Sequence, residues 1–212
     1  MSYLKCQSEN IYYIGGSPCS GKSTVAARLA EKYGFYYFKV DDFLDDYLKK
    51  GIVKGKPICS KQSNMTSEQI WMRAPEIQQM EELEFYKEIF EFIIADISDI
   101  NSANSAIITE GASYLPELMR EIGVDQKHYI NITPSFDFQY THYKERPYVP
   151  HVLKDCRDKD KAFDNWMKRD ALFAEYVRNQ SYELGYKTLL TDGTISCDEV
   201  FQIVCREFDL EG

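Results

Sequence analysis

Residues 15–24 carry the side chains and the spacing best suited to chemistry. From Gly16 the sequence follows the pattern G-x-x-x-x-G-K-S, which ends in Gly21, Lys22 and Ser23. Glycines let a backbone fold tightly and turn consecutive N–H groups inward, which makes a concave anion site at the start of a helix. A lysine in this place reaches the β- and γ-phosphates of a nucleotide, and the serine hydroxyl can bind Mg²⁺. The pattern is the Walker A phosphate loop, and it predicts binding of a nucleoside triphosphate.

The segments on either side provide the context that this loop requires. Residues 10–14 are expected to form a buried strand, and residues 23–30 a helix with Val25 and Leu29 on its apolar face. A strand that leads in and a helix that leads out distinguish the loop from a chance glycine-rich turn. Cys19 lies inside the loop, near a helix N-terminus that can make a thiol reactive, but we interpret it as a small filler residue.

Two acidic residues follow a second predicted strand. Residues 35–40 are mostly aromatic and β-branched, and they are followed by Asp41 and Asp42. Acids at the carboxyl end of a parallel strand face the crevice in which open α/β sheets bind ligands. We therefore interpret Asp41, beside the phosphate loop, as a catalytic base. Asp42 is interpreted as the cap of a short helix that follows it.

A third acidic side chain ends a third predicted strand. Residues 106–109 form a short apolar run that leads to Glu110 and Gly111. As a parallel strand, this run would deliver Glu110 to the same crevice. A carboxylate there can orient Mg²⁺-bound water or accept a hydrogen bond from the phosphate loop, which is the Walker B role. Ser23 and Glu110 together are the predicted metal-binding residues.

Arginines in the second half of the chain are candidates for charge stabilisation. Residues 144–161 are charged and interrupted by prolines, and they include Arg146 and Arg157. Interspersed aspartates allow a solvated surface, but an arginine-bearing lid that stabilises a transferring phosphoryl group is the alternative. Arg169, off the centre of the apolar stripe of the next helix, could point back to the phosphates. Arg73 either is exposed or holds an anionic group of an acceptor.

The segment after Asp42 gives a weaker indication of the acceptor. Residues 49–65 lack periodicity and are expected to be a mobile loop. The segment carries five lysines, which either are solvated or attract an anionic acceptor: Lys49, Lys50, Lys54, Lys56 and Lys61.

Strands and amphipathic helices must position these residues. Pro75 opens a long predicted helix whose apolar face includes Ile77, Met80 and Leu83. After a turn-rich connection at 101–105, strands are expected at 127–133 and at 187–191. Five short strands that alternate with helices predict a parallel sheet covered on both faces.

Composition limits the class of protein. The chain has 212 residues and a mass of 24.7 kDa, which predicts one domain spanning residues 1–212. A net charge of −9 and a pI near 4.9 argue against a polynucleotide substrate. Six irregularly spaced cysteines support neither a zinc site nor a disulfide framework. With no apolar signal core at 1–9 and no run of membrane-spanning length, we expect a cytoplasmic protein without a membrane partner.

The Walker A loop, the Asp-Asp-Phe element at 41–43 and the Glu-Gly pair at 110–111 together resemble the phosphate-loop kinases of small molecules. The combination is similar to uridine kinase, nicotinamide riboside kinase, zeta toxin and chloramphenicol phosphotransferase. The resemblance covers the order of elements along the whole chain. It implies the α/β fold of P-loop nucleoside triphosphatases, a three-layer αβα sandwich with a five-stranded parallel sheet in the order 2-3-1-4-5. It also implies a helical lid at about 144–162 and an acceptor-binding region at about 42–75.

Roles for single residues follow from the same resemblance. Asp41 would activate the acceptor hydroxyl and Glu110 would organise Mg²⁺. The lid arginine would be Arg146 or Arg157, with Arg169 a further candidate. The loop that contains Gly193 would lie near the adenine. The phosphates would be cradled by Gly16, Ser17, Pro18, Cys19, Ser20, Gly21, Lys22, Ser23 and Thr24.

The predicted function is that of an ATP- and Mg²⁺-dependent phosphotransferase. It would move the γ-phosphoryl group to a hydroxyl of a small molecule such as a nucleoside or a sugar. A nucleotide monophosphate kinase is an alternative, although the chain has no paired-arginine lid signature of the adenylate-kinase kind. A nucleotide-dependent regulatory switch is another alternative. A switch would need no base at Asp41, but it would need a group that orients the water molecule that attacks the γ-phosphate.

Overall fold

A computed structural model describes residues 10–101 and 106–210, so the expectations for residues 1–9 and for most of the turn at 101–105 lie outside the described residues. The described strands are β1 (Ile11–Gly15), β2 (Tyr36–Lys39), β3 (Ile107–Glu110), β4 (Tyr129–Pro134) and β5 (Lys187–Thr191). The described helices are α1 (Lys22–Tyr33), the 3₁₀ helix η1 (Val40–Phe43), α2 (Leu44–Val53), α3 (Pro57–Ser63), α4 (Ser67–Trp71), α5 (Pro75–Asn101), α6 (Pro116–Glu121), α7 (Phe136–Lys144), α8 (Val149–Val152), α9 (Lys159–Leu184) and α10 (Cys197–Glu207). Within these ranges, every helix is too short or too polar to cross a membrane.

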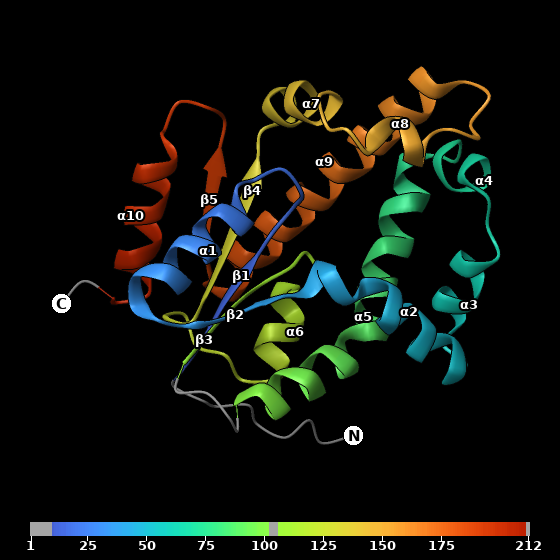
Figure 1. Ribbon diagram of the computed structural model, residues 1–212. Coiled ribbons are helices and arrows are strands. Elements are labelled where there is room, and N and C mark those ends of the chain that lie inside the picture. The colour runs from blue at the N-terminus through green and yellow to red at the C-terminus, as the bar shows by residue number, and fades with distance from the viewer. Residues whose placement is uncertain (1–9, 102–105, 211–212) are drawn as a thin grey trace.

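The five strands form one parallel sheet in the order β2-β3-β1-β4-β5 (Figure 1). β1 is the central strand, with Ile11 opposite Ile107 of β3 and Tyr13 opposite Tyr129 of β4. Because all strands run the same way, the carboxyl ends of β1, β2 and β3 meet at one edge. Beside β1 the chain changes from one half of the sheet to the other, and ligands bind at such a point in open α/β sheets. The structure confirms the predicted order 2-3-1-4-5.

Alternating side chains on the strands divide the main core into two parts. Ile11 and Tyr13 of β1 belong to a cluster that includes α5, α6 and α9, whereas Ile14 belongs to a cluster with α1 and α10. Figure 1 shows α1 and α10 on one side of the sheet, and α5, α6 and α9 on the other. Both faces of the sheet are therefore covered, as a parallel sheet requires. This arrangement confirms the three-layer α/β fold.

A third, smaller cluster lies beside the phosphate loop. It contains Tyr143 from α7, Val149 from α8 and Trp166 from α9, and Cys19 and Trp71 pack against it. The rings of Trp71 and Trp166 stack with their centres 4.4 Å apart, which links α4 to α9. The segment at 144–162, for which a lid was predicted, contains α8 and part of this cluster.

The segment at 49–65, predicted to be a mobile loop, is instead mostly helical. α2 continues to Val53, and α3 covers Pro57–Ser63. Lys54 and Lys56 both form ion pairs with Glu91 of α5. The prediction was wrong because these short helices are held in place by α5, a helix that lies much later in the chain.

The first turns of α5 bury a different face from the one predicted. Ile77 is 43% exposed and Met80 is 58% exposed, whereas Glu81 and Glu82 are buried. Both carboxylates form ion pairs with cations on neighbouring segments. The apolar stripe was therefore wrong at Ile77 and Met80, because here the helix turns its polar residues toward other charged groups.

Replacing Gly16 by alanine should destabilise the fold far more than replacing Gly34. Both glycines have positive φ angles, +115° and +70°, at which a Cβ costs about 1–2 kcal/mol. A Cβ on Gly16 would also lie 2.0 Å from the carbonyl oxygen of Ile132, whereas one on Gly34 would meet nothing within 4 Å. We expect the free energy of unfolding to fall by more than about 3 kcal/mol for Gly16→Ala and by about 1 kcal/mol for Gly34→Ala. Denaturant titration measures both, and equal losses would contradict the close packing of the loop on β4.

Candidate active site

The phosphate loop joins β1 to α1 through two glycines with positive φ. Gly16 approaches the backbone of β4, and Gly21 (φ +88°) is the N-cap of α1. In the described part of the chain no side chain caps α1, and its first turn has no acidic residue. The first N–H groups of this 12-residue helix therefore have no competing side-chain acceptor. Such a helix N-terminus attracts an anion.

Arg146 lies against the phosphate loop. Its Nη2 is 3.9 Å from the Cys19 Sγ, which accepts a weak hydrogen bond from it. Cys19 itself has a φ of +65°, which is uncommon for a residue other than glycine. The contact places one of the predicted lid arginines beside the segment that is predicted to hold the phosphates.

Lys22 is buried within the loop. Its Nζ donates a hydrogen bond of 2.7 Å to the carbonyl oxygen of Ser17. Burial lowers the pKa of Lys22, and the nearby carboxylates of Glu110 and Asp41 act in the opposite direction. A point charge held here can neutralise phosphate oxygens.

Glu110 is held by two hydroxyl groups. Its Oε1 accepts hydrogen bonds from the Ser23 Oγ at 2.8 Å and from the Tyr37 hydroxyl at 3.1 Å. Burial, together with the negative charge of Glu110, raises the pKa of Tyr37 far above its usual range, so that this hydroxyl remains a donor. Tyr37 is not among the predicted site residues, because in the sequence it is one of several aromatic residues of a strand.

The pair formed by Ser23 and Glu110 fits a magnesium ion. The Oε2 of Glu110 is buried and has no hydrogen-bond partner among the described residues. No group of three histidine, cysteine, aspartate or glutamate side chains suited to a metal occurs in the described ranges. Mg²⁺ is commonly held by only one or two carboxylates, together with water and substrate phosphates. A hydroxyl and one free carboxylate oxygen at the phosphate loop match that need.

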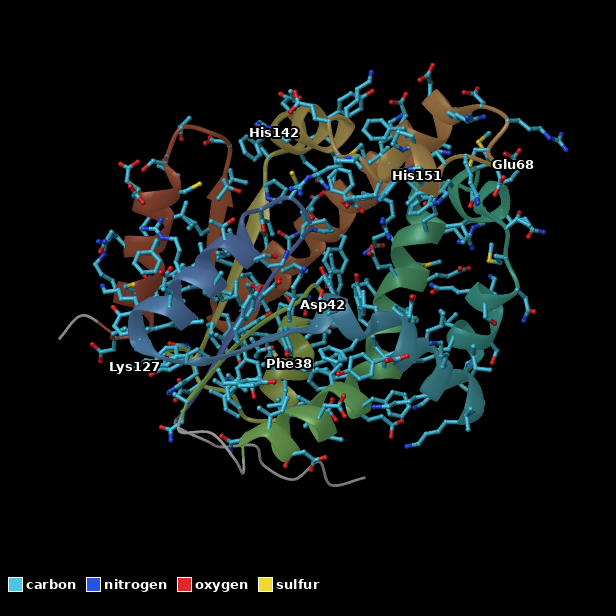
Figure 2. All side chains as sticks on the ribbon, in the orientation of Figure 1. Phe38, Asp42, Glu68, Lys127, His142 and His151 are labelled. Carbon is cyan, nitrogen blue, oxygen red and sulfur yellow. The ribbon has the colours of Figure 1, made fainter. Side chains whose placement is uncertain are left out.

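A cavity of about 530 Å³ opens beside the loop and gathers most of the predicted site residues. Asp41 reaches it from η1, and Glu110 reaches it from the end of β3. Arg157 is not part of its lining, and its backbone N–H donates a 2.9 Å hydrogen bond to Glu68 of α4, labelled in Figure 2. The predicted residues that line the cavity are Pro18, Cys19, Ser20, Gly21, Lys22, Ser23, Thr24, Asp41, Glu110, Arg146 and Arg169.

Asp42 does not cap a helix. The N-cap of α2 is Phe43, and no side chain of the described residues caps either α2 or η1. The Asp42 carboxylate instead lies 3.3 Å from the Nζ of Lys39 at the end of β2. The predicted cap was wrong because a 3₁₀ turn precedes α2 and moves its start beyond Asp42.

Arg169 lines the cavity between two buried acids. Its Nη1 lies 2.7 Å from Glu82 Oε1, and its Nε lies 2.6 Å from Asp170 Oδ1. Burial raises the pKa values of both carboxyl groups, and the positive charge of Arg169 opposes the rise. Burial alone would lower the pKa of Arg169, but Asp170 and Glu82 raise it above its usual range. The charge of Arg169 is therefore already neutralised by carboxylates of the protein, and this side chain forms part of the cavity wall.

A second cavity of about 360 Å³ lies on the other side of the loop. Phe138 and His142 line it, with their rings stacked at 4.0 Å, and His142 is labelled in Figure 2. Gly193 lies across from them, where a Cβ would meet the Phe138 ring at 3.3 Å. The two cavities share Cys19, Ser20, Gly21, Thr24 and Arg146.

No protein-family model and no curated protein sequence matches this chain. A presumed kinase from Chloroflexus aurantiacus J-10-fl has a similar structure, with 16% identity over 95% of this chain and 99% of that chain, and a TM-score of 0.43. Shikimate kinase from Aquifex aeolicus VF5 matches with 18% identity over 95% of this chain and 99% of that chain, and a TM-score of 0.38. At these scores neither structure decides the function of this chain.

Replacing Tyr37 by phenylalanine should weaken magnesium-dependent nucleotide binding. The change removes the hydroxyl that holds Glu110 from β2 and leaves Ser23 as its only described partner. Loss of a group that orients a metal ligand typically costs about 10- to 100-fold in affinity. Calorimetric titration with ATP, in Mg²⁺ and in EDTA, should show this loss only with Mg²⁺.

Tyr36→Phe is the matched control, because Tyr36 is the neighbouring residue of β2 and its side chain is 45% exposed. Identical Mg²⁺·ATP affinities for the two variants would contradict a positioning role for Tyr37.

Proposed function

We propose that this chain is an ATP-dependent kinase that phosphorylates a hydroxyl of a small molecule. The observation that carries the proposal is a single cavity lined both by the phosphate loop and by Asp41. A carboxylate in the same cavity as Lys22 can take the proton of a hydroxyl aligned with a γ-phosphate. A protein that only binds nucleotide has no need of such an acid, which favours transfer over a regulatory switch.

In this proposal the adenine base would lie in the second cavity, beside Phe138 and His142. Aromatic rings offer flat surfaces on which a purine can stack. Gly193 leaves space next to Phe138 that a larger side chain would fill. Because both cavities share residues of the phosphate loop, a nucleotide bound in this way would pass its phosphates across the loop toward Asp41.

Ser23 and Glu110 would hold Mg²⁺, which neutralises charge on the β- and γ-phosphate oxygens when it is bound. Tyr37 is a positioning residue, because it fixes the carboxylate of Glu110 and does not line the cavity. Lys22 supplies a further positive charge from within the loop. These groups would stabilise the negative charge of the phosphoryl group in the transition state.

In the transfer step, the acceptor oxygen bonds to the γ-phosphorus while the bond from this phosphorus to the bridging oxygen breaks. Asp41 takes the hydroxyl proton, and ADP leaves with the bridging oxygen. Arg146 is the arginine assigned to the transferring group, because it lines both cavities and contacts the loop. Arg169 is already paired with two carboxylates, so it would not bind the phosphoryl group. It would instead fix the cavity wall beside the acceptor.

Acceptor-dependent ADP release tests the proposal. The panel would contain nucleosides, sugars, amino sugars and nucleoside monophosphates, with Lys22→Ala protein prepared in parallel to reveal contaminating activity. At least one acceptor should raise ADP release above the acceptor-free rate in the wild type and not in Lys22→Ala. If no acceptor raises the rate while ATP binds, a nucleotide-dependent switch becomes the better account.

Asp41→Asn should lower phosphoryl transfer strongly and leave ATP affinity nearly unchanged. General-base assistance contributes about 10²- to 10⁴-fold to a rate, so the loss should appear in kcat. Asp42→Asn is the matched control, because Asp42 pairs with Lys39 on the surface and does not line the cavity. Steady-state kinetics with the best acceptor, and ATP titration, measure the two effects. A nearly silent Asp41→Asn beside an inactive Asp42→Asn would reverse the assignment.

A further inference from the structure

We propose that the acceptor is an amine-bearing polyol, such as an amino sugar, and that Glu82 binds its ammonium group. The inference rests on the proposed kinase function and adds the chemical class of its substrate.

The Glu82 carboxylate is only partly used by the protein. Its Oε1 lies 2.7 Å from the Arg169 Nη1 and accepts a 3.1 Å hydrogen bond from the Tyr86 hydroxyl. Its Oε2 is buried and has no hydrogen-bond partner among the described residues. Glu82 is only 8% exposed, yet it lines the cavity that contains Asp41. A buried carboxylate oxygen without a partner is costly, so a donor on a bound ligand would complete it.

The charges around Glu82 favour a cation as that donor. When ionised, Glu82 and Asp170 together carry one more negative charge than Arg169 neutralises. Asp170 is fully buried, and its Oδ2 accepts a 2.8 Å hydrogen bond from Gln139. Burial is the main cause of the raised pKa values of Glu82 and Asp170, and the negative charge of Glu82 adds to the rise at Asp170. An ammonium at Glu82 Oε2 would neutralise the remaining negative charge.

Aromatic rings complete the surroundings of the ammonium. Tyr86, Tyr143 and Trp166 line the same cavity as Glu82. The faces of such rings attract cations by about 0.5–2 kcal/mol. They also provide the apolar walls that typically orient a small ligand, with a few polar groups giving specificity. A site with carboxylates and aromatic walls suits a ligand that carries an amine on a carbon ring better than it suits a ligand that carries an anionic group.

The lysines and arginines on this side of the cavity are already paired. Lys39 is paired with Asp42, and Arg169 is paired as described above. Lys22 and Arg146 instead contact the phosphate loop. An anionic group bound beside Glu82 would therefore compete with the existing ion pairs of Arg169.

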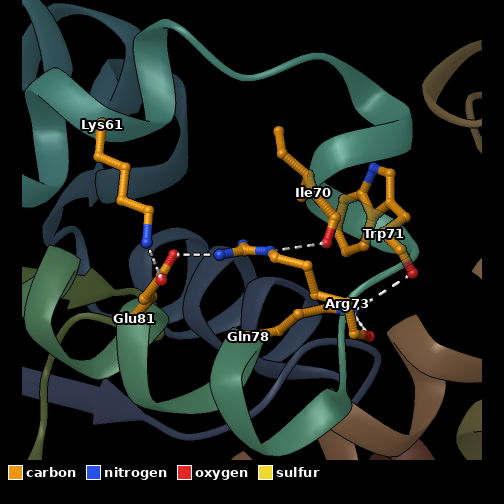
Figure 3. Close-up of polar contacts among 6 residues, drawn as sticks. All are labelled: Lys61, Ile70, Trp71, Arg73, Gln78 and Glu81. Carbon is orange, nitrogen blue, oxygen red and sulfur yellow. Dashed lines mark hydrogen bonds and ion pairs between the residues drawn. The ribbon is translucent and has the colours of Figure 1, made fainter.

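Arg73, for which binding of an anionic acceptor was one interpretation, is also paired. Its Nη1 lies 2.6 Å from Glu81 Oε2, and the Nζ of Lys61 lies 2.5 Å from the other oxygen (Figure 3). The Nε of Arg73 donates to the carbonyl oxygen of Ile70, which fixes the guanidinium in this place. Glu81 thus holds both Arg73 and Lys61 in ion pairs, and neither of these cations lines the cavity that contains Asp41.

Three acceptors with the same ring test the inference in the wild type. Glucosamine carries the ammonium, N-acetylglucosamine replaces it by an amide, and glucuronate carries a negative charge. If this ring fits, kcat/KM should be at least about 10-fold higher for glucosamine than for N-acetylglucosamine, and lowest for glucuronate. A set of aminocyclitols and their N-acetyl forms extends the comparison to other rings. The inference is overturned if neutral or anionic acceptors are phosphorylated as well as their amine partners.

The variant Glu82→Gln tests whether Glu82 is the residue that selects an amine-bearing acceptor. The ratio of kcat/KM for the amine to kcat/KM for its N-acetyl form should fall toward one in this variant. Glu84→Gln is the matched control on α5, because Glu84 is exposed and pairs with Lys87 on the surface, so it should keep the wild-type ratio. An unchanged ratio in folded Glu82→Gln would overturn the assignment to Glu82. If Glu82→Gln does not fold, the wild-type comparison of amine with N-acetyl acceptors still decides the substrate class.

These outcomes separate the two proposals. Phosphorylation of neutral acceptors alone would retain the kinase and reject the amine. A wild type that binds ATP and phosphorylates nothing in either panel would reject the kinase itself.

Discussion

The buried ion pairs of Arg169 with Glu82 and Asp170 are the interaction on which one wall of the cavity beside Asp41 depends. The pair of Arg169 with Glu82 connects α9 to α5, which have 26 and 27 residues, and Asp170 is the residue next to Arg169 on α9. Removing charged groups from water is costly, and losing one partner would leave an uncompensated buried charge. Any sliding or rotation of one helix against the other would separate Arg169 from Glu82. The position of the cavity wall is therefore fixed by electrostatics as well as by apolar packing.

Local chemistry explains why the loop between β1 and α1 and the position of Glu110 could be predicted from the sequence. The spacing of Gly16, Gly21 and Lys22 specifies a backbone conformation as well as a set of side chains, and the structure contains the two positive φ angles that it requires. Glu110 was found because it follows a short apolar run, which the structure confirms as β3. The order of the strands was predicted only through a resemblance, since the sequence of a strand does not determine which strand pairs with it.

Partners that are distant along the chain explain what could not be predicted. Tyr37 acts through Glu110, 73 residues away, and without that contact it is an ordinary aromatic of an edge strand. Ile77 and Met80 have the spacing of a buried stripe, but ion pairs with other segments turn the acidic face of α5 inward. Helical periodicity reports which residues share a face. It does not report whether that face meets an apolar sheet or charged neighbours.

The small cluster around α8 has a consequence for local stability. It forms a core of its own, separate from the two that cover the sheet. Segments held by few buried apolar contacts open at a lower free energy than global unfolding. Tyr143 and Trp166 belong to this cluster and also line the larger cavity, so opening it would widen the cavity while both faces of the sheet stay covered. The cost of admitting a bulky ligand is then set by the side chains around α8 and not by the stability of the whole domain.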